Sequence, residues 1–139
     1  MVQLIAGKKG KGKTKHLLDK VNAEVQNVSG NIVYLDKSTK HMYELNNKIR
    51  LIDVSSYLIT NSDEFVGFIS GIISQDHDLE QMYFDSFLNI AHIENEEIEP
   101  IIAKLEKISE VFNVTFVVSI SVDEAELPAS LKEKIIVSL

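Results

Sequence analysis

The sequence predicts an α/β domain: a three-layer sandwich in which a mainly parallel sheet of about five strands lies between flanking helices. Short apolar runs alternate with segments of helical apolar spacing, which is the order of a parallel sheet. The length of 139 residues suits one domain, so we treat 1–139 as a single unit. Apolar residues make up 45% and charged residues 25%, a balance that excludes disorder for most of the chain.

Short apolar runs mark the expected strands. They are residues 2–6, 32–35, 81–84, 114–122 and 135–139. Each run is bounded by glycine, asparagine, aspartate or other polar residues, which is typical of buried strands. Apolar and polar residues also alternate on both sides of Asn46-Asn47, and asparagine tolerates a positive φ. We therefore expect a hairpin at about residues 39–54, extending the edge of the sheet.

Four segments carry helical apolar spacing. They are residues 13–28, 65–73, 95–112 and 128–134. Gly30 is expected to cap the end of the first helix. Pro100 is expected in the first turn of the third helix, where its missing N–H costs nothing.

Several classes of protein are excluded by composition. The chain has no cysteine, so it has no disulfides, zinc-thiolate sites or cysteine nucleophiles. The longest mostly apolar run, residues 65–74, is too short for a membrane-spanning helix, which needs about 20 residues. The N-terminus has no apolar signal core, so we expect a cytoplasmic protein with no membrane partner.

The net charge of −7 hides one basic segment. Five lysines fall within eight positions: Lys8, Lys9, Lys11, Lys13 and Lys15. The rest of the chain is therefore more acidic than the average suggests. It would repel a nucleic acid, which makes that partner unlikely, whereas the lysine segment itself should attract a smaller anion.

Residues 7–14 of this segment fit the Walker A pattern G-x-x-x-x-G-K-[ST]. Glycines let backbone N–H groups point at a phosphate, and the helix that follows offers more unpaired N–H groups. Lys13 would reach the β- and γ-phosphates, and Thr14 would bind Mg²⁺ through its hydroxyl. Without nucleotide, we expect Lys13 to face solvent. The expected nucleotide-binding residues are Gly7, Lys8, Lys9, Gly10, Lys11, Gly12, Lys13, Thr14 and Lys15.

On these residues the sequence resembles the P-loop NTPase superfamily, specifically over residues 2–20 and in architecture beyond them. It looks like a small stand-alone bacterial ATP-binding protein of the ATPase branch. The resemblance implies that the nucleotide binds at the carboxyl edge of a central parallel sheet. It also implies a Walker B strand that ends in an aspartate on the Mg²⁺.

Two aspartates compete for the Walker B position. We favour Asp85, which follows the apolar residues 82–84, over Asp36, which follows residues 32–35. The strand after Asp85 ends in Ser119 and Ser121, which resembles the polar sensor position of the ATPase branch. The expected catalytic residues are Lys13 and Asp85, and the expected Mg²⁺ ligands are Thr14 and Asp85.

Departures from the family weaken the case for hydrolysis. A glutamate commonly follows the Walker B aspartate in hydrolytic members, and Ser86 stands there. Arg50 is the only arginine, so a finger in cis must be Arg50 or a lysine, and a kinase with several arginines is disfavoured. No N-K-x-D guanine motif is present, so ATP is expected by elimination.

The sequence leaves three functions open. The first is ATP binding with weak or partner-dependent hydrolysis, completed by a protein partner or a second subunit. The second is a non-catalytic nucleotide-dependent switch or assembly subunit. The third is a small-molecule kinase with Asp36 as base. We expect His16 to be a solvated helix residue and residues 76–78 to form a solvated loop rather than a metal site.

Overall fold

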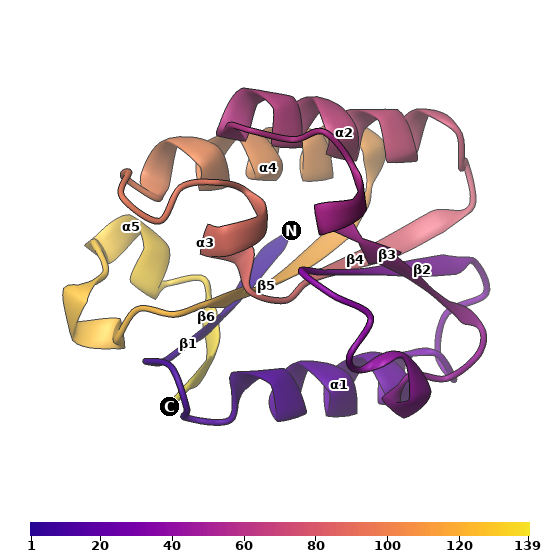
Figure 1. The fold of residues 1–139 in the computed structure, drawn as a ribbon, viewed down its shortest axis with the longest axis horizontal. Coiled ribbons are helices and arrows are strands. Elements are labelled where there is room, and N and C mark those ends of the chain that lie inside the picture. The colour runs from indigo at the N-terminus through magenta and orange to yellow at the C-terminus, as the bar shows by residue number, and fades with distance from the viewer.

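The computed structural model describes residues 1–139 and contains a sheet of six parallel strands, one more than expected (Figure 1). The strands are β1 (Val2–Ala6), β2 (Asn31–Asp36), β3 (Ile49–Asp53), β4 (Leu79–Phe84), β5 (Thr115–Ile120) and β6 (Ile135–Ser138). Their order across the sheet is β3-β2-β4-β5-β1-β6. Because all pairings are parallel, all six strands end at one edge of the sheet.

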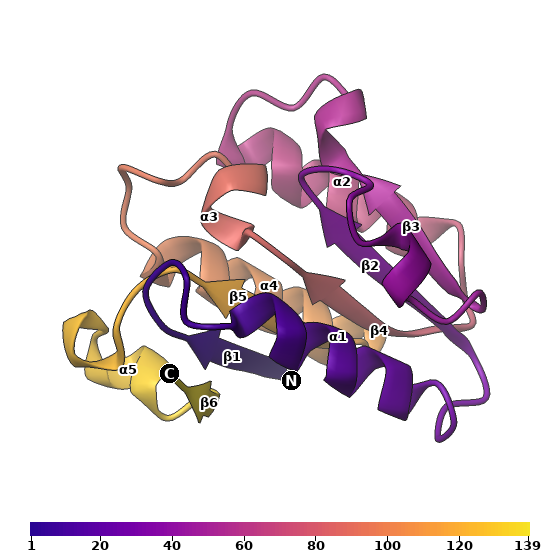
Figure 2. The same cartoon turned by 60° about the horizontal axis from the view of Figure 1, so that its bottom comes forward.

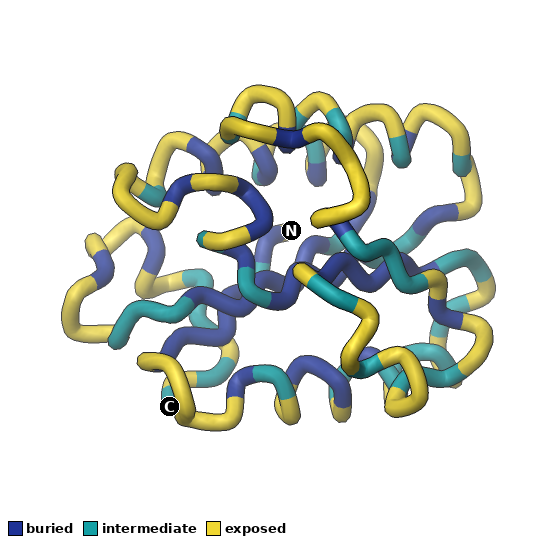
Figure 3. Tube along the Cα trace, in the orientation of Figure 1, coloured by how far each residue is buried: buried dark blue, intermediate teal, exposed yellow.

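Helices cover both faces of the sheet, which confirms the three-layer α/β architecture. They are α1 (Lys13–Glu24), α2 (Ser62–Ser74), α3 (Phe87–Ile90), α4 (Glu99–Phe112) and α5 (Ala129–Lys132). Helix α1 lies under one face, and α2, α3 and α4 lie over the other (Figures 1 and 2). The sheet is the most buried layer of the trace (Figure 3). The helices are all too short or too polar to cross a lipid bilayer.

Two segments depart from the expected helix ends. Helix α1 ends at Glu24, before Gly30, although Val25 and Val28 still pack against the core beneath it. Gly30 is not a helix cap. A Cβ there would collide with the backbone oxygen of Asp78, so this position needs a residue without a side chain. Helix α4 begins at Glu99, and Pro100 lies in its first turn as expected.

The hairpin expected at 39–54 is wrong. Residues 42–44 form a 3₁₀ turn, and residues 49–53 form β3, which pairs parallel to β2. Asn46 does make a turn, since its side chain accepts from the N–H of Lys48, but no antiparallel partner precedes it. Leu45 packs into the core under α1 instead. The connection is long enough for a crossover, and partial burial of Leu45 against the core outweighs the short alternating pattern.

An aromatic cluster fixes the corner between β4 and α3. Phe84 and Phe87 pack together with ring centroids 5.8 Å apart, and both are fully buried. Phe65 of α2 and Phe116 of β5 complete the cluster. Ser86, between the two corner phenylalanines, has a left-handed backbone (φ 53°) that lets the chain turn sharply. The corner therefore holds Asp85 between two anchored side chains.

Candidate functional site

The loop between β1 and α1 has the backbone of an anion-binding loop. Gly10 and Gly12 have φ values of 82° and 92°, which residues with a Cβ rarely adopt. Gly12 is the N-cap of α1, and no side chain caps the helix there. The first turn of α1 also lacks an acidic residue. The first N–H groups and the positive dipole end of this helix therefore have no side-chain partner.

Lys13 lies inside the loop rather than in solvent. Only 7% of the residue is exposed, and its Nζ donates to the backbone oxygen of Lys8 at 3.0 Å. Burial lowers the pKa of Lys13; Lys9 lowers it further, and Asp85 opposes the shift. The expectation that Lys13 faces solvent without nucleotide is wrong, because the side chain folds back on its own loop.

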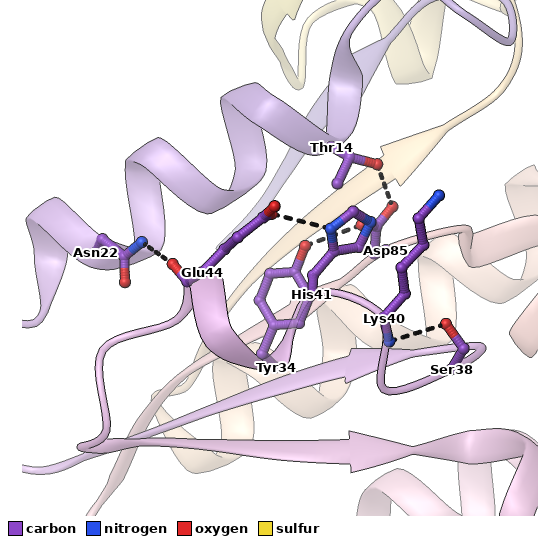
Figure 4. A network of polar contacts seen from close by, with 8 residues as sticks. All are labelled: Thr14, Asn22, Tyr34, Ser38, Lys40, His41, Glu44 and Asp85. Atoms are coloured by element: carbon purple, nitrogen blue, oxygen red, sulfur yellow. Dashed lines mark hydrogen bonds and ion pairs between the residues drawn. The ribbon is translucent and has the colours of Figure 1, made fainter.

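Thr14 and Asp85 meet beneath this loop. Thr14 Oγ1 donates to Asp85 Oδ1 at 3.2 Å, and the Tyr34 hydroxyl donates to Asp85 Oδ2 at 2.9 Å (Figure 4). Asp85 is only 3% exposed. Burial, and then Asp85, raises the pKa of Tyr34, so this hydroxyl stays protonated and remains a donor. The carboxylate is thus held by a donor on either side.

A cavity of about 520 Å³ opens at the carboxyl edge of the sheet. Its lining includes six of the ten predicted site residues: Lys9, Gly10, Gly12, Lys13, Thr14 and Asp85. Ser119 and Ser121, from the end of β5, also line it. The other four predicted residues are not in the lining: Gly7, Lys8, Lys11 and Lys15. Of these, Lys15 is exposed and pairs with Asp19 at 3.3 Å along α1.

Sequence reasoning missed three polar residues of the cavity: Lys37, Asn89 and Glu94. Lys37 could have been found, because it follows Asp36 at the end of an expected strand. Asn89 and Glu94 belong to α3 and the segment after it, which carry no recognisable pattern. They add one cation, one amide and one carboxylate to the site.

Asp36 lies next to Asp85 at the same edge. It is 3% exposed; its Oδ1 accepts from the N–H of Lys37 at 2.7 Å, and its Oδ2 has no partner. Burial, and then Asp85, raises the pKa of Asp36. Thr14 bonds to Asp85 and not to Asp36.

The remaining candidates lie outside the cavity. Arg50 Nη2 pairs with Asp76 Oδ2 at 3.2 Å, and Asp76 also accepts from the side chain of Asn31. Asp76 precedes β4, at the opposite edge of the sheet from Asp85. Arg50 therefore lies away from the cavity and is paired with a carboxylate at the other edge of the sheet. His16 is exposed on α1 and does not line the cavity.

Solved structures share this fold. A KaiC-like protein of the hyperthermophilic archaeon Pyrococcus horikoshii OT3 superposes with a TM-score of 0.60 at 21% identity, over 85% of this chain and 59% of its own. The flagellar accessory protein FlaH of Methanocaldococcus jannaschii superposes with a TM-score of 0.57 at 14% identity, over 93% of this chain and 63% of its own. The chain thus spans about three fifths of each. No family model and no curated protein matches it.

At these identities the similarity concerns the fold alone. An all-parallel sheet with a glycine- and lysine-rich loop after its first strand is consistent with the P-loop NTPase fold. This chain is therefore similar to the KaiC-like protein and to FlaH in the architecture of the fold.

Proposed function

We propose that the chain binds Mg-ATP at the carboxyl edge of its sheet and hydrolyses it weakly, or only with a partner. One observation carries the proposal: an uncapped helix N-terminus, a buried lysine and a Thr14–Asp85 pair converge on one cavity. Each feature alone occurs in other contexts. Together they supply a phosphate cradle, a cation and oxygen ligands at one point.

The loop would bind the phosphates with its own backbone. The turn through Gly10 and Gly12 directs the chain into α1, and the first N–H groups of that helix have no side-chain cap. Lys13 already lies inside the loop on a carbonyl, so a phosphate oxygen can replace that acceptor with a small side-chain movement. Lys9 and Lys37 line the same cavity and add positive charge.

The oxygen donors suit Mg²⁺. Thr14 and Asp85 offer a hydroxyl and a carboxylate, the hard ligands that this ion prefers, and they already lie in contact. Thr14 would hold the ion directly and Asp85 through water. When bound, Mg²⁺ neutralises charge on the β- and γ-phosphates. Tyr34 keeps Asp85 oriented for this role.

The lining supports slow turnover. Ser86 lines the cavity where a glutamate would orient the attacking water, and no arginine lines it. Glu94 is the one other carboxylate in the lining. A protein partner or a second copy of the chain, contributing an arginine, would complete the charge stabilisation of the transition state. Without such an arginine, the chain would bind ATP but hydrolyse it slowly.

A non-catalytic switch is the second candidate, and Lys37 favours it. Lys37 lines the cavity and begins the connection from β2 to β3. A nucleotide that engages Lys37 would bias the position of this connection, and so change a surface of the protein.

Calorimetric titration with Mg-ATP, Mg-ADP and Mg-GTP, followed by phosphate release from the same sample, tests the proposal. We expect ATP binding with slow or partner-dependent release. Lys13→Ala should weaken this binding. Lys20→Ala is its matched control, because Lys20 lies on the same helix but pairs with Glu24 and does not line the cavity. Absence of binding to all three nucleotides would overturn the proposal, and binding without any release, with or without candidate partners, would favour the switch.

A further inference from the structure

We propose a second cation site beside the nucleotide cavity: a divalent transition-metal ion held by Asp36, His41 and Asp85. The three residues follow β2, lie in the β2–β3 connection and follow β4. One ligand atom from each lies within 4.8 Å of the other two. The site does not depend on nucleotide binding, although it shares Asp85 with the proposed Mg²⁺ site.

An unpartnered buried oxygen is the first argument. Asp36 Oδ2 is the one buried side-chain polar atom of the chain without a hydrogen-bond partner. A buried carboxylate oxygen without a partner costs free energy, and native structures seldom leave one unexplained. A cation bound among the three side chains supplies the missing partner.

The orientation of His41 is the second argument. Its Nδ1 bonds to Glu44 Oε2 at 2.9 Å (Figure 4). A histidine that donates one ring N–H to a carboxylate presents the lone pair of its other nitrogen, which is the usual arrangement of a metal-binding histidine. With Nδ1 bonded to Glu44, Nε2 is the ring nitrogen left to bind a metal. Asp85 is also oriented, by Thr14 and Tyr34, and each of its oxygens keeps a lone pair for a metal.

Anchors on α1 hold the turn that carries His41. The Asn22 side chain donates to the backbone oxygen of Glu44 at 2.8 Å and accepts from the N–H of Asn46 at 2.8 Å. The 3₁₀ turn at residues 42–44 is therefore anchored to α1 at its C-terminal end, and the N–H of Glu44 donates back to the backbone oxygen of His41. His41 lies over the aspartates because its turn is held there, and binding would need little ordering of the chain.

The ligand set selects the class of ion. One imidazole and two carboxylates suit Zn²⁺, Mn²⁺ or Co²⁺, whereas Mg²⁺ and Ca²⁺ prefer oxygen alone. Metal–ligand bonds of about 2.0–2.2 Å place tetrahedral ligand atoms roughly 3.3 Å apart. A modest inward adjustment of the three side chains reaches that separation. Three protein ligands leave a fourth position open to water or another small ligand.

Co²⁺ is the probe, because its visible absorption reports the ligands directly. Chelator-stripped protein is titrated with Co²⁺ and then Zn²⁺, without nucleotide, by absorbance and calorimetry. We expect one ion per chain and displacement of Co²⁺ by Zn²⁺. His41→Gln should abolish the signal. His77→Gln, which removes an exposed histidine outside the cluster, should leave it unchanged.

Glu44→Ala keeps the proposal testable if His41→Gln is unstable. Glu44 is exposed, its backbone contact with Asn22 survives, and loss of such an orienting carboxylate weakens metal binding about 10–100-fold. Mg-ATP binding, measured on the same variants, separates this proposal from the proposed function. The metal site is overturned if Co²⁺ does not bind stoichiometrically, if His41→Gln binds it as the wild type does, or if binding requires nucleotide.

Discussion

Replacing Tyr34 with phenylalanine removes one hydroxyl and tests whether Asp85 is held as the structure indicates. The hydroxyl donates to Asp85 Oδ2 at 2.9 Å, and both residues are buried. Phenylalanine fills the same volume, so no cavity is created. The variant leaves a buried carboxylate oxygen without its donor, and that loss dominates the change in stability.

The cost follows from the kind of hydrogen bond. A bond to a charged group contributes about 1.5–3 kcal/mol. A chain of this length loses about 3 °C of melting temperature per kcal/mol, so we expect a fall of roughly 5–10 °C. Mg-ATP affinity should fall as well, because Asp85 loses one of the two donors that orient it.

Tyr83→Phe is the matched control. Its hydroxyl donates to the neutral side chain of Gln81 at 2.6 Å, and its ring stacks on that of Tyr34. A neutral bond contributes about 0.5–1.5 kcal/mol, and the ring contact is kept in both variants. Urea unfolding measures the free energy of unfolding of each variant. If Tyr34→Phe is no more destabilising than Tyr83→Phe, our account of how Asp85 is oriented is refuted.

Three further predictions concern the loop, the core and the buried acid. Lys13→Ala should weaken Mg-ATP binding about 10–100-fold, which corresponds to the loss of one hydrogen bond to a charged group. The variant should remain folded. Calorimetry measures the affinity, and circular dichroism checks the fold. Phe84→Ala should cost about 3–5 kcal/mol in urea unfolding, whereas Phe112→Ala, at a side chain 55% exposed, should cost far less. Asp36→Asn should stabilise the metal-free protein at neutral pH. Its folded pKa is raised above the unfolded value, so the ionised carboxyl opposes folding above the folded pKa. The gain in stability from Asp36→Asn should vanish as the pH falls below the pKa of Asp36 in the unfolded chain. A gain in stability that stays the same at low pH would contradict this.

The sequence was sufficient to predict the architecture because buried strands and amphipathic helices carry strong periodic signals. The loop at residues 7–14 and the aspartates at strand ends were recognisable for the same reason: parallel strands place their carboxyl ends together. The structure of residues 39–54 could not be predicted, because a short alternating pattern cannot distinguish a hairpin from a turn followed by a parallel strand. Burial of Leu45 under α1 decides between them, and that contact is made in the tertiary structure.

Contacts between side chains that are distant in the sequence were the least predictable part of the site. Nothing in the sequence indicates that His41 joins Asp36 and Asp85. Lys13 also differs from expectation, because its acceptor is a carbonyl of its own loop rather than water. Such contacts depend on how a connection crosses the sheet edge, which local pattern does not encode.

Backbone amide chemical shifts, recorded while Mg-ATP is added to ¹⁵N-labelled protein, test the central claim most directly. We predict the largest shift changes at the amides of Gly10, Gly12 and Thr14, with smaller ones at Ser119 and Ser121, which also line the cavity. Amides at the other edge of the sheet, such as that of His77, should not move. Saturating Mg-ATP that leaves the amides of residues 7–14 unchanged, or shifts those of another surface instead, would contradict the account.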